Sequence, residues 1–210
     1  SSNIDQLYPL SALDDIEGTW LEVRGRNCGK KGSNWEGGYD ALPCRTSSWI
    51  LEQNQWWYHT SFCEPGSSNS CKGDSVHLLA QPGINQSQAG ELAVHYVDPP
   101  LKPQEEKWYV LSRPNSDWMM YAYCGSTPVG EYAGVNIITR NQRPWEKGIP
   151  TDVEKILREK AAIFNIEYDQ MCPSDHSRCP AINAEKDIKE GIKSESGCRE
   201  NNRRVRLQSR

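Results

Sequence analysis

The residues best placed to exchange protons form one short cluster, in which His95 and Tyr96 are followed by Asp98. Histidine changes its charge between about pH 5 and 8, so a carboxyl group beside it can take part in general acid–base chemistry. His59 and His77 alternate with apolar residues and are typical of histidines whose hydrogen bonds are satisfied within a sheet. The sequence therefore singles out residues 95–98 as the first candidate for titratable chemistry.

Other common chemistries lack their sequence signatures. The four His residues include no pair at positions i and i+4, so we predict no metal site. No Gly-x-Ser-x-Gly motif indicates a serine hydrolase, and no glycine-rich loop follows a strand to hold a phosphate. The 24 Lys and Arg and 28 Asp and Glu residues give a net charge of −4, which does not favour a nucleic-acid partner.

Length and composition favour one domain with an unusual apolar content. The 210 residues are 36% hydrophobic, and eight Trp and nine Tyr outnumber two Phe. Trp and Tyr have an apolar body and a polar tip, which suits strands around a partly wet cavity. No apolar run approaches the roughly 20 residues of a transmembrane helix. The first residue is Ser, which is typical of a mature chain whose targeting segment has been removed.

Short alternating segments rich in Trp, Tyr, Val and Ile predict an all-β protein. A lead-in at 1–14 precedes them, and turn residues separate them. Eight short strands at this spacing favour an antiparallel sandwich or an up-and-down barrel. The predicted strands are 16–24, 46–53, 55–62, 75–80, 91–97, 106–112, 117–124 and 133–140.

The pattern changes to helical after the last strand. Thr151 followed by Glu154 forms a capping box, so we predict a helix over 151–166 with Thr151 as its N-cap. One apolar stripe on this helix should pack on the outer wall of the barrel. The stripe comprises Val153, Ile156, Leu157, Ala161 and Phe164.

The C-terminal segment has a different charge. Residues 181–210 contain eight basic and five acidic residues, a local charge of 8 − 5 = +3. Such a segment has too few apolar residues to fold against its own barrel. We predict a basic tail over 181–210 that either lies in solvent or docks on a partner, after a barrel domain over 15–180.

The start of the first strand resembles that of the lipocalin family. Gly18-Thr19-Trp20 opens the strand pattern, and Arg140 ends it. In lipocalins a Gly-x-Trp closes the floor of the barrel, and an arginine after the last strand covers the indole. The resemblance implies an eight-stranded antiparallel lipocalin barrel in which Gly18, Trp20 and Arg140 have structural roles.

A narrower resemblance is to the lipocalin domain of the violaxanthin de-epoxidase family. Blocks in the same order carry it, at residues 39–44, 94–98, 107–111, 121–125, 131–140 and 168–172. The family implies a protein of the plastid thylakoid lumen whose barrel holds a xanthophyll. Its enzymes open the epoxide reductively with ascorbate, and the epoxide oxygen leaves only after an acid protonates it.

The resemblance also implies site residues. The family's acid corresponds to either Asp98 or Glu106, and a cavity tyrosine corresponds to Tyr123. A second family tyrosine falls on Ile138, which cannot donate a proton. The predicted ligand-contacting residues are His95, Tyr96, Trp57, Trp108 and Tyr121.

Eight cysteines without a zinc-type spacing favour a disulfide framework in an oxidising compartment. The family implies a bond between Cys44 and Cys172. Cys63 and Cys71 enclose a polar loop and should pair locally. Elimination and proximity leave two further pairs, Cys28 with Cys124 and Cys179 with Cys198.

Three functions follow from these observations. The first is a non-catalytic accessory or assembly subunit of a photosynthetic membrane complex, which docks through its tail and long loops and binds a xanthophyll or lipid. The second is an active xanthophyll de-epoxidase with ascorbate as reductant. The third is an extracellular lipid carrier. None requires a tightly bound cofactor, although a carotenoid could be the bound ligand.

Overall fold

The computed structural model describes residues 7–8, 15–26, 44–52, 55–62, 74–82, 91–96, 105–127, 130–141 and 147–174. The chain divides into residues 1–179 and 180–210, and every described residue belongs to the first unit. Seven of the predicted features lie outside the described residues. They are Asp98, Cys28, Cys63, Cys71, Cys179, Cys198 and the tail 181–210.

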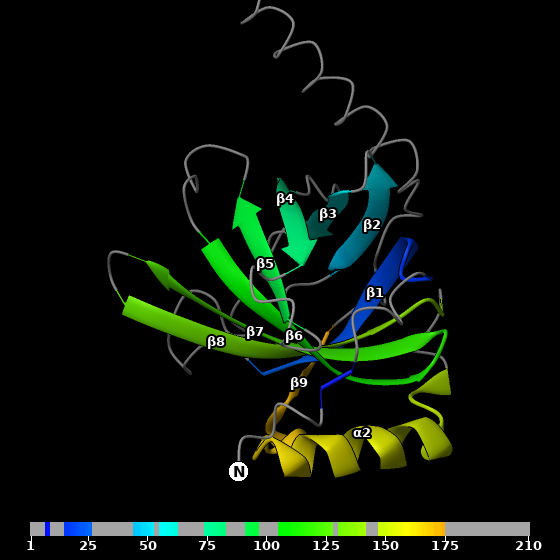
Figure 1. Ribbon diagram of the computed structural model, residues 1–210. Helices are drawn as coiled ribbons and strands as arrows, with labels where there is room; N and C mark the ends of the chain where they lie inside the picture. The colour runs from blue at the N-terminus through cyan, green and yellow to red at the C-terminus, as the bar shows by residue number, and fades with distance from the viewer. Residues whose placement is uncertain are drawn as a thin grey trace, which may run out of the picture. The chain divides into compact units, whose positions relative to one another are not determined.

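Eight antiparallel strands follow one another around a closed ring (Figure 1). Each strand pairs with the next, and β1 pairs with both β8 and β2, which closes the sheet on itself. The predicted lipocalin barrel is therefore confirmed. The strands are β1 (Gly18–Gly25), β2 (Thr46–Glu52), β3 (Gln55–Phe62), β4 (Asp74–Pro82), β5 (Glu91–Tyr96), β6 (Glu105–Asn115), β7 (Trp118–Thr127) and β8 (Gly130–Thr139).

The two-residue period of the strands divides their side chains between two clusters. On β7, Met119, Tyr121 and Tyr123 belong to the cluster inside the barrel. Met120 and Ala122, the residues between them, belong to a second cluster on the outer wall. The outer cluster contains the residues that pack against the helix.

The helix α2 (Thr151–Ile163) lies beside the curled sheet (Figure 1). Its buried residues are Val153, Leu157 and Ala161, at steps of four, and they pack in the outer cluster. The predicted stripe is thus narrower than expected, because Ile156 is 38% exposed. The helix is followed by a 3-10 turn η4 (Tyr168–Gln170) and a short strand β9 (Cys172–Pro173) that pairs with β1.

The ends of the helix differ from the prediction. Pro150 is the N-cap, and its carbonyl accepts the Glu154 N–H at 2.8 Å. Thr151 is already helical, so the capping box is not formed and no side chain caps this end. The helix ends at Ile163 rather than 166, because Asn165 adopts a left-handed conformation with φ of 56°.

The floor of the barrel is built around Trp20, which is fully buried. Its indole N–H donates to the Ile16 carbonyl at 2.8 Å, and the Arg140 guanidinium lies 4.6 Å from the ring centroid. The structure therefore contains the stacking that the lipocalin resemblance implies. Gly18 has φ of +116°, a conformation that residues with a Cβ rarely adopt. Glycine is required there to turn the chain into β1.

Two arginines at this floor form hydrogen bonds and an ion pair with the residues before β1. The Arg140 guanidinium donates to the carbonyls of Asp15 and Glu17, the latter at 2.8 Å. The Arg113 side chain is 3% exposed and pairs with the Asp15 carboxylate. The hydrogen bond from Arg113 holds the pKa of Asp15 below its usual value.

The cysteines of the described chain are in two states. Cys44 and Cys172 are disulfide-bonded, whereas Cys124 is a free thiol. β9 pairs Cys172 with Gly25, and the Glu22 N–H donates to the carbonyl of Arg45, the residue after Cys44. β2 and β9 thus follow the same edge of β1, which favours the predicted Cys44–Cys172 bond. The structure does not contain the predicted Cys28–Cys124 bond, since Cys124 lies within β7 as a free thiol.

No helix in the described ranges has the length and apolar content that crossing a membrane would need.

Trp20→Ala should destabilise the barrel strongly, because it removes a buried indole, a hydrogen bond and the stacking surface of Arg140. Truncating a buried Trp typically costs roughly 3–5 kcal/mol. Urea unfolding followed by circular dichroism measures the change. Leu51→Ala is the matched control, because Leu51 is 47% exposed on β2 and should change the stability by less than about 0.5 kcal/mol. Equal unfolding midpoints for the two variants would contradict the assignment of Trp20 to the floor.

Candidate ligand site inside the barrel

An aromatic cluster occupies the barrel interior, with Trp49 of β2 at its centre. The Trp49 ring meets three others edge-to-face, at centroid distances of 6.4 Å to Trp56, 4.9 Å to Tyr58 and 5.7 Å to Trp108. Tyr58 and Trp108 also meet each other at 4.7 Å. Edge-to-face contacts of this kind stabilise a fixed arrangement of rings. The cluster is therefore a rigid wall assembled from β2, β3 and β6.

Tyr121 extends this wall toward β8. Its ring stacks on Trp108 at 4.9 Å, and its hydroxyl accepts a hydrogen bond from the Asn136 amide at 2.9 Å. Burial raises the pKa of Tyr121 well above its usual value. The phenol therefore stays protonated.

A buried carboxyl group lies at one side of the cluster. Glu106 of β6 is 6% exposed, and each of its two oxygens accepts a hydrogen bond. One comes from the Trp108 indole N–H at 2.6 Å and the other from the Tyr132 hydroxyl at 2.6 Å. These two donors fix the orientation of the carboxyl group among aromatic rings.

Two tyrosines beside Glu106 each lie over a glycine of the neighbouring strand. In the register of β7 and β8, Tyr123 is opposite Gly134, and Gly125 is opposite Tyr132. A Cβ at Gly134 would overlap the Tyr123 ring, and one at Gly125 would lie 2.5 Å from the Tyr132 hydroxyl. The two glycines therefore provide the space in which both rings turn inward, with their centroids 6.3 Å apart.

Glu106 and the two tyrosines beside it, Tyr123 and Tyr132, are called the Glu106 group. This group lies at the opposite end of the barrel from the Trp20 floor. Arg140, which stacks on Trp20, is separated from Tyr132 by eight residues along β8 and the residue after it, roughly 27 Å of extended chain. The order along the inner face of β8 is Ile138, Asn136, Gly134 and Tyr132. A ligand that entered from the end opposite the floor would meet the Glu106 group first.

The interior also holds an ion pair. The Arg45 guanidinium and the Glu22 carboxylate are 2.7 Å apart, and their side chains are 4% and 3% exposed. The Ser174 hydroxyl donates to Glu22 at 3.2 Å. A buried pair of this kind demands fixed geometry, because removing either partner leaves an uncompensated charge.

One buried polar atom in this wall has no partner among the described residues. The Trp49 indole N–H makes no hydrogen bond there, although Trp49 is only 2% exposed. Buried N–H groups are nearly always hydrogen-bonded, and each exception calls for an explanation. An acceptor atom supplied by a ligand would satisfy this donor.

The structure brings some of the predicted site residues together and separates others. Glu106, Tyr123, Trp108 and Tyr121 are all buried on the inner face. His95 lies on the outer face, because its neighbour Val94 belongs to the inner cluster. Trp57 is outside for the same reason, since Trp56 and Tyr58 pack inside. The side chain of Tyr96 lies outside the described residues.

Sequence reasoning missed several interior residues. Tyr132 of β8 donates a hydrogen bond to Glu106, whereas Ile138 packs in the inner cluster. Strict alternation from Trp20 could have indicated Glu22, and alternation from Trp108 could have placed Glu106 on the inner face. Nothing in the sequence reveals the partners of these carboxylates, because they lie on other strands. The residues missed are Glu22, Arg45, Tyr58, Tyr132 and Asn136.

The arrangement suits ligand binding and proton donation. Among the described residues, no three His, Cys, Asp or Glu side chains lie together as metal ligands would. The inner wall offers aromatic faces and the indole N–H of Trp49. These groups suit an apolar molecule that carries oxygen atoms.

Comparison with solved structures supports this description of the fold. Lobster apocrustacyanin A1 matches with a TM-score of 0.59 and 11% identity, over 86% of this chain and 89% of its own. Insecticyanin from the tobacco hornworm Manduca sexta matches with a TM-score of 0.55 and 12% identity, over 82% and 85%. The siderocalin Ex-FABP, described as functioning through dual ligand specificities, matches with 0.54 and 8%, over 81% and 100%.

These structural relatives are lipocalins, and at such low identity they show the fold alone. The sequence matches no protein-family model and no curated relative. The protein is thus a lipocalin barrel, a fold consistent with binding small apolar molecules.

Gly134→Ala should displace the Tyr123 ring and destabilise the barrel by about 1–3 kcal/mol, as overpacking typically does. The loss of stability caused by Gly134→Ala should be smaller when Tyr123→Ala is also present, because the added methyl group then meets no ring. Urea unfolding of the two single variants and the double variant measures this coupling. Ala133→Ser, on the exposed outer face of β8, is the control and should be nearly neutral. Additive costs in the double variant would contradict the close Tyr123–Gly134 contact.

Proposed function

We propose that the protein binds an elongated apolar ligand of the xanthophyll or lipid class, with an oxygen-bearing end against the inner wall. The lipocalin fold supports this proposal, because the solved structures that this chain resembles have a barrel of the same kind. The aromatic cluster would form the base of the site, and the Glu106 group would contact the part of the ligand nearer the end of the barrel opposite the Trp20 floor.

The unpaired indole N–H of Trp49 carries this proposal. A donor in an aromatic wall costs free energy unless an acceptor reaches it, and a pure hydrocarbon has none. A hydroxyl, carbonyl or epoxide oxygen would accept its hydrogen bond. The proposed ligand is therefore an oxygenated apolar molecule rather than a simple hydrocarbon.

The biological role that we propose is an accessory or assembly subunit of a photosynthetic membrane complex in the thylakoid lumen. The ordered resemblance to the violaxanthin de-epoxidase family supports the location. The excess of basic residues in 181–210 supports docking on an acidic partner surface. An extracellular lipid carrier remains the alternative for the same barrel.

Zeaxanthin and β-carotene test the ligand class, because they share a hydrocarbon skeleton and differ in their ring hydroxyls. The protein should bind zeaxanthin more tightly, as followed by carotenoid absorption and tryptophan quenching. Trp49→Phe keeps the ring but removes the N–H, so it should weaken zeaxanthin binding about tenfold, or roughly 1.4 kcal/mol, and leave β-carotene unaffected.

Trp56→Phe is the matched control for this change, because Trp56 is a neighbouring indole that is only partly buried. Mass spectrometry of ligands extracted from natively purified protein is the independent check. Failure to bind either carotenoid, together with extracts that contain no pigment or lipid, would overturn the proposed function.

The contact between Glu106 and Tyr132 favours a second candidate, reductive de-epoxidation. Here Glu106 would protonate the epoxide oxygen as a C–O bond breaks. Ascorbate would supply two electrons, and the oxygen would leave as water after a second protonation. Tyr132 would orient the Glu106 carboxyl group through its hydrogen bond at 2.6 Å. Tyr123 would contact the ligand beside it.

This second candidate predicts that the protein converts violaxanthin at acidic pH with ascorbate, as measured by chromatography of the pigments. Glu106→Gln and Tyr132→Phe should each lower the rate at least about tenfold by removing the acid or its orienting partner. Ile138→Val, a small change near the floor, should keep the rate of the parent. Absence of conversion by the parent protein would exclude catalysis and leave the binding role.

A further inference from the structure

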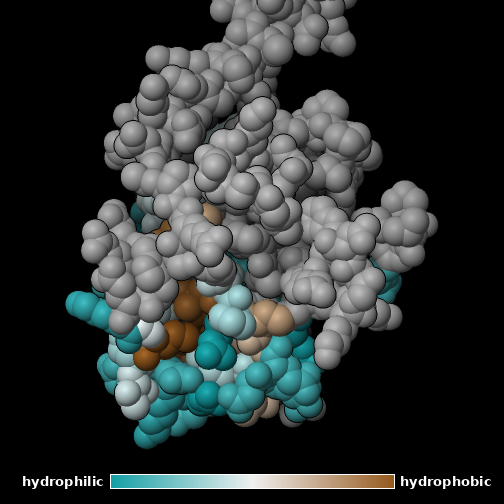
Figure 2. Space-filling view, turned by 180° about the vertical axis from the view of Figure 1, so that it is seen from behind, coloured by the Kyte–Doolittle hydropathy of each residue, from teal (hydrophilic) through white to brown (hydrophobic). Residues whose placement is uncertain are grey.

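A hollow on the outer wall of the barrel is separate from the interior site. It has a volume of about 740 Å³ and lies between the outer face of β5–β8 and the segment that follows α2. A space of this size falls within the usual range of small-molecule sites, about 300–1,000 Å³. Figure 2 shows hydrophobic side chains gathered on one face of the molecule above a hydrophilic border.

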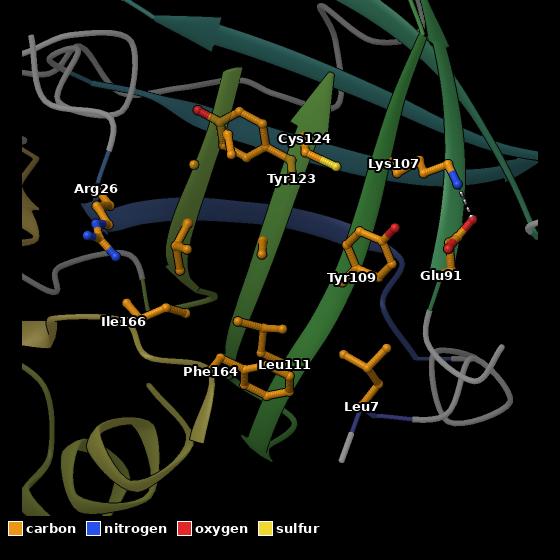
Figure 3. Close-up of a pocket in the computed structure, with 14 residues that line it drawn as sticks. Leu7, Arg26, Glu91, Lys107, Tyr109, Leu111, Tyr123, Cys124, Phe164 and Ile166 are labelled. Atoms are coloured by element: carbon orange, nitrogen blue, oxygen red, sulfur yellow. Dashed lines mark ion pairs between the residues drawn. The ribbon is translucent and has the colours of Figure 1, made fainter. Parts of the chain in front are cut away.

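Small residues on β7 and β8 make the floor of this outer groove. Ala122 is opposite Val135 in the strand register, and Cys124 is opposite Ala133. Larger apolar side chains surround the floor, and α2 leaves this part of the sheet uncovered. In Figure 3, Leu111, Phe164 and Leu7 lie along one side and Ile166 closes the end near Arg26.

Charged groups lie on opposite sides of the groove (Figure 3). On one side the Lys107 ammonium is 3.5 Å from the Glu91 carboxylate, which also accepts a hydrogen bond from Tyr109. Burial and Glu91 raise the pKa of Tyr109 to about 12, so this hydroxyl stays protonated. The Glu91 charge is thus already paired within the protein.

Arg26 on the other side is held more loosely. Its guanidinium is 3.9 Å from the Glu167 carboxylate, and the two side chains are 40% and 61% exposed. Exposed pairs of this kind contribute little. Arg26 can therefore exchange this contact for a carboxylate brought by a ligand, which its planar guanidinium can bind through two hydrogen bonds.

We propose that the outer groove binds a small amphiphilic carboxylate, with its apolar chain on the Ala122–Val135 floor and its carboxylate on Arg26. The charges favour this ligand over a cation, because Glu91 is already paired with Lys107, whereas the described partner of Arg26 is the exposed Glu167 carboxylate. The groove faces away from the barrel interior, so this inference does not depend on the proposed function.

Laurate is the test ligand, and dodecanol is its uncharged counterpart. Isothermal titration should show that Ala133→Trp, which fills the groove from an exposed position, weakens laurate binding at least about tenfold. Arg26→Gln should weaken laurate about tenfold but leave dodecanol unchanged. The matched controls are Glu159→Trp and Lys155→Gln, on the exposed face of α2, and neither should alter binding.

Cys124 provides a reporter that identifies the site directly. It is a half-buried free thiol in the groove lining, and burial raises its pKa. Laurate should slow its reaction with N-ethylmaleimide at about pH 8.5, as peptide mass spectrometry would show. Zeaxanthin, the probe of the interior, should not displace laurate.

Three results would overturn the proposal. The first is laurate binding that is absent or insensitive to Ala133→Trp and Arg26→Gln. The second is displacement of laurate by zeaxanthin, which would place the fatty acid in the interior. The third is protection of Cys124 that needs no laurate and rises with protein concentration, which would identify a second copy of the chain as the occupant.

Discussion

A curled sheet closes into a barrel only if its last strand pairs with its first, and here the first strand, β1, closes the ring. It pairs with β8 on one edge and with β2 and β9 on the other. Closure places Glu22 beside Arg45 and holds Trp20 under Arg140.

Alternation of side chains predicted all eight strands within a few residues, because a half-buried strand must show its period in the sequence. Register was not predictable in the same way. Glu106 and Tyr132 are 26 residues apart and meet only through the pairing of β6, β7 and β8. An irregularity in β6 between Val110 and Ser112 shifts that pairing, and no local sequence pattern indicates it.

The assignment of side chains to faces failed where aromatic residues are adjacent. In Trp56-Trp57-Tyr58 each residue suits an aromatic wall, yet only Trp56 and Tyr58 pack inside. His95 follows the buried Val94 and must point the other way. Chemical type alone suggested Trp57 and His95 as ligand contacts. The two-residue period, applied from Val94 and from Tyr58, would have placed them outside.

The same period explains why β7 and β8 serve two surfaces. Their inner positions carry large rings such as Tyr121 and Tyr123, and their outer positions carry small residues such as Ala122 and Cys124. Large inner residues fill the barrel, and small outer residues leave the hollow beyond α2. Tyr123 and Gly134 belong to both, since they line the outer groove and also form the close pair inside. Both surfaces therefore depend on the same pairing of β7 with β8.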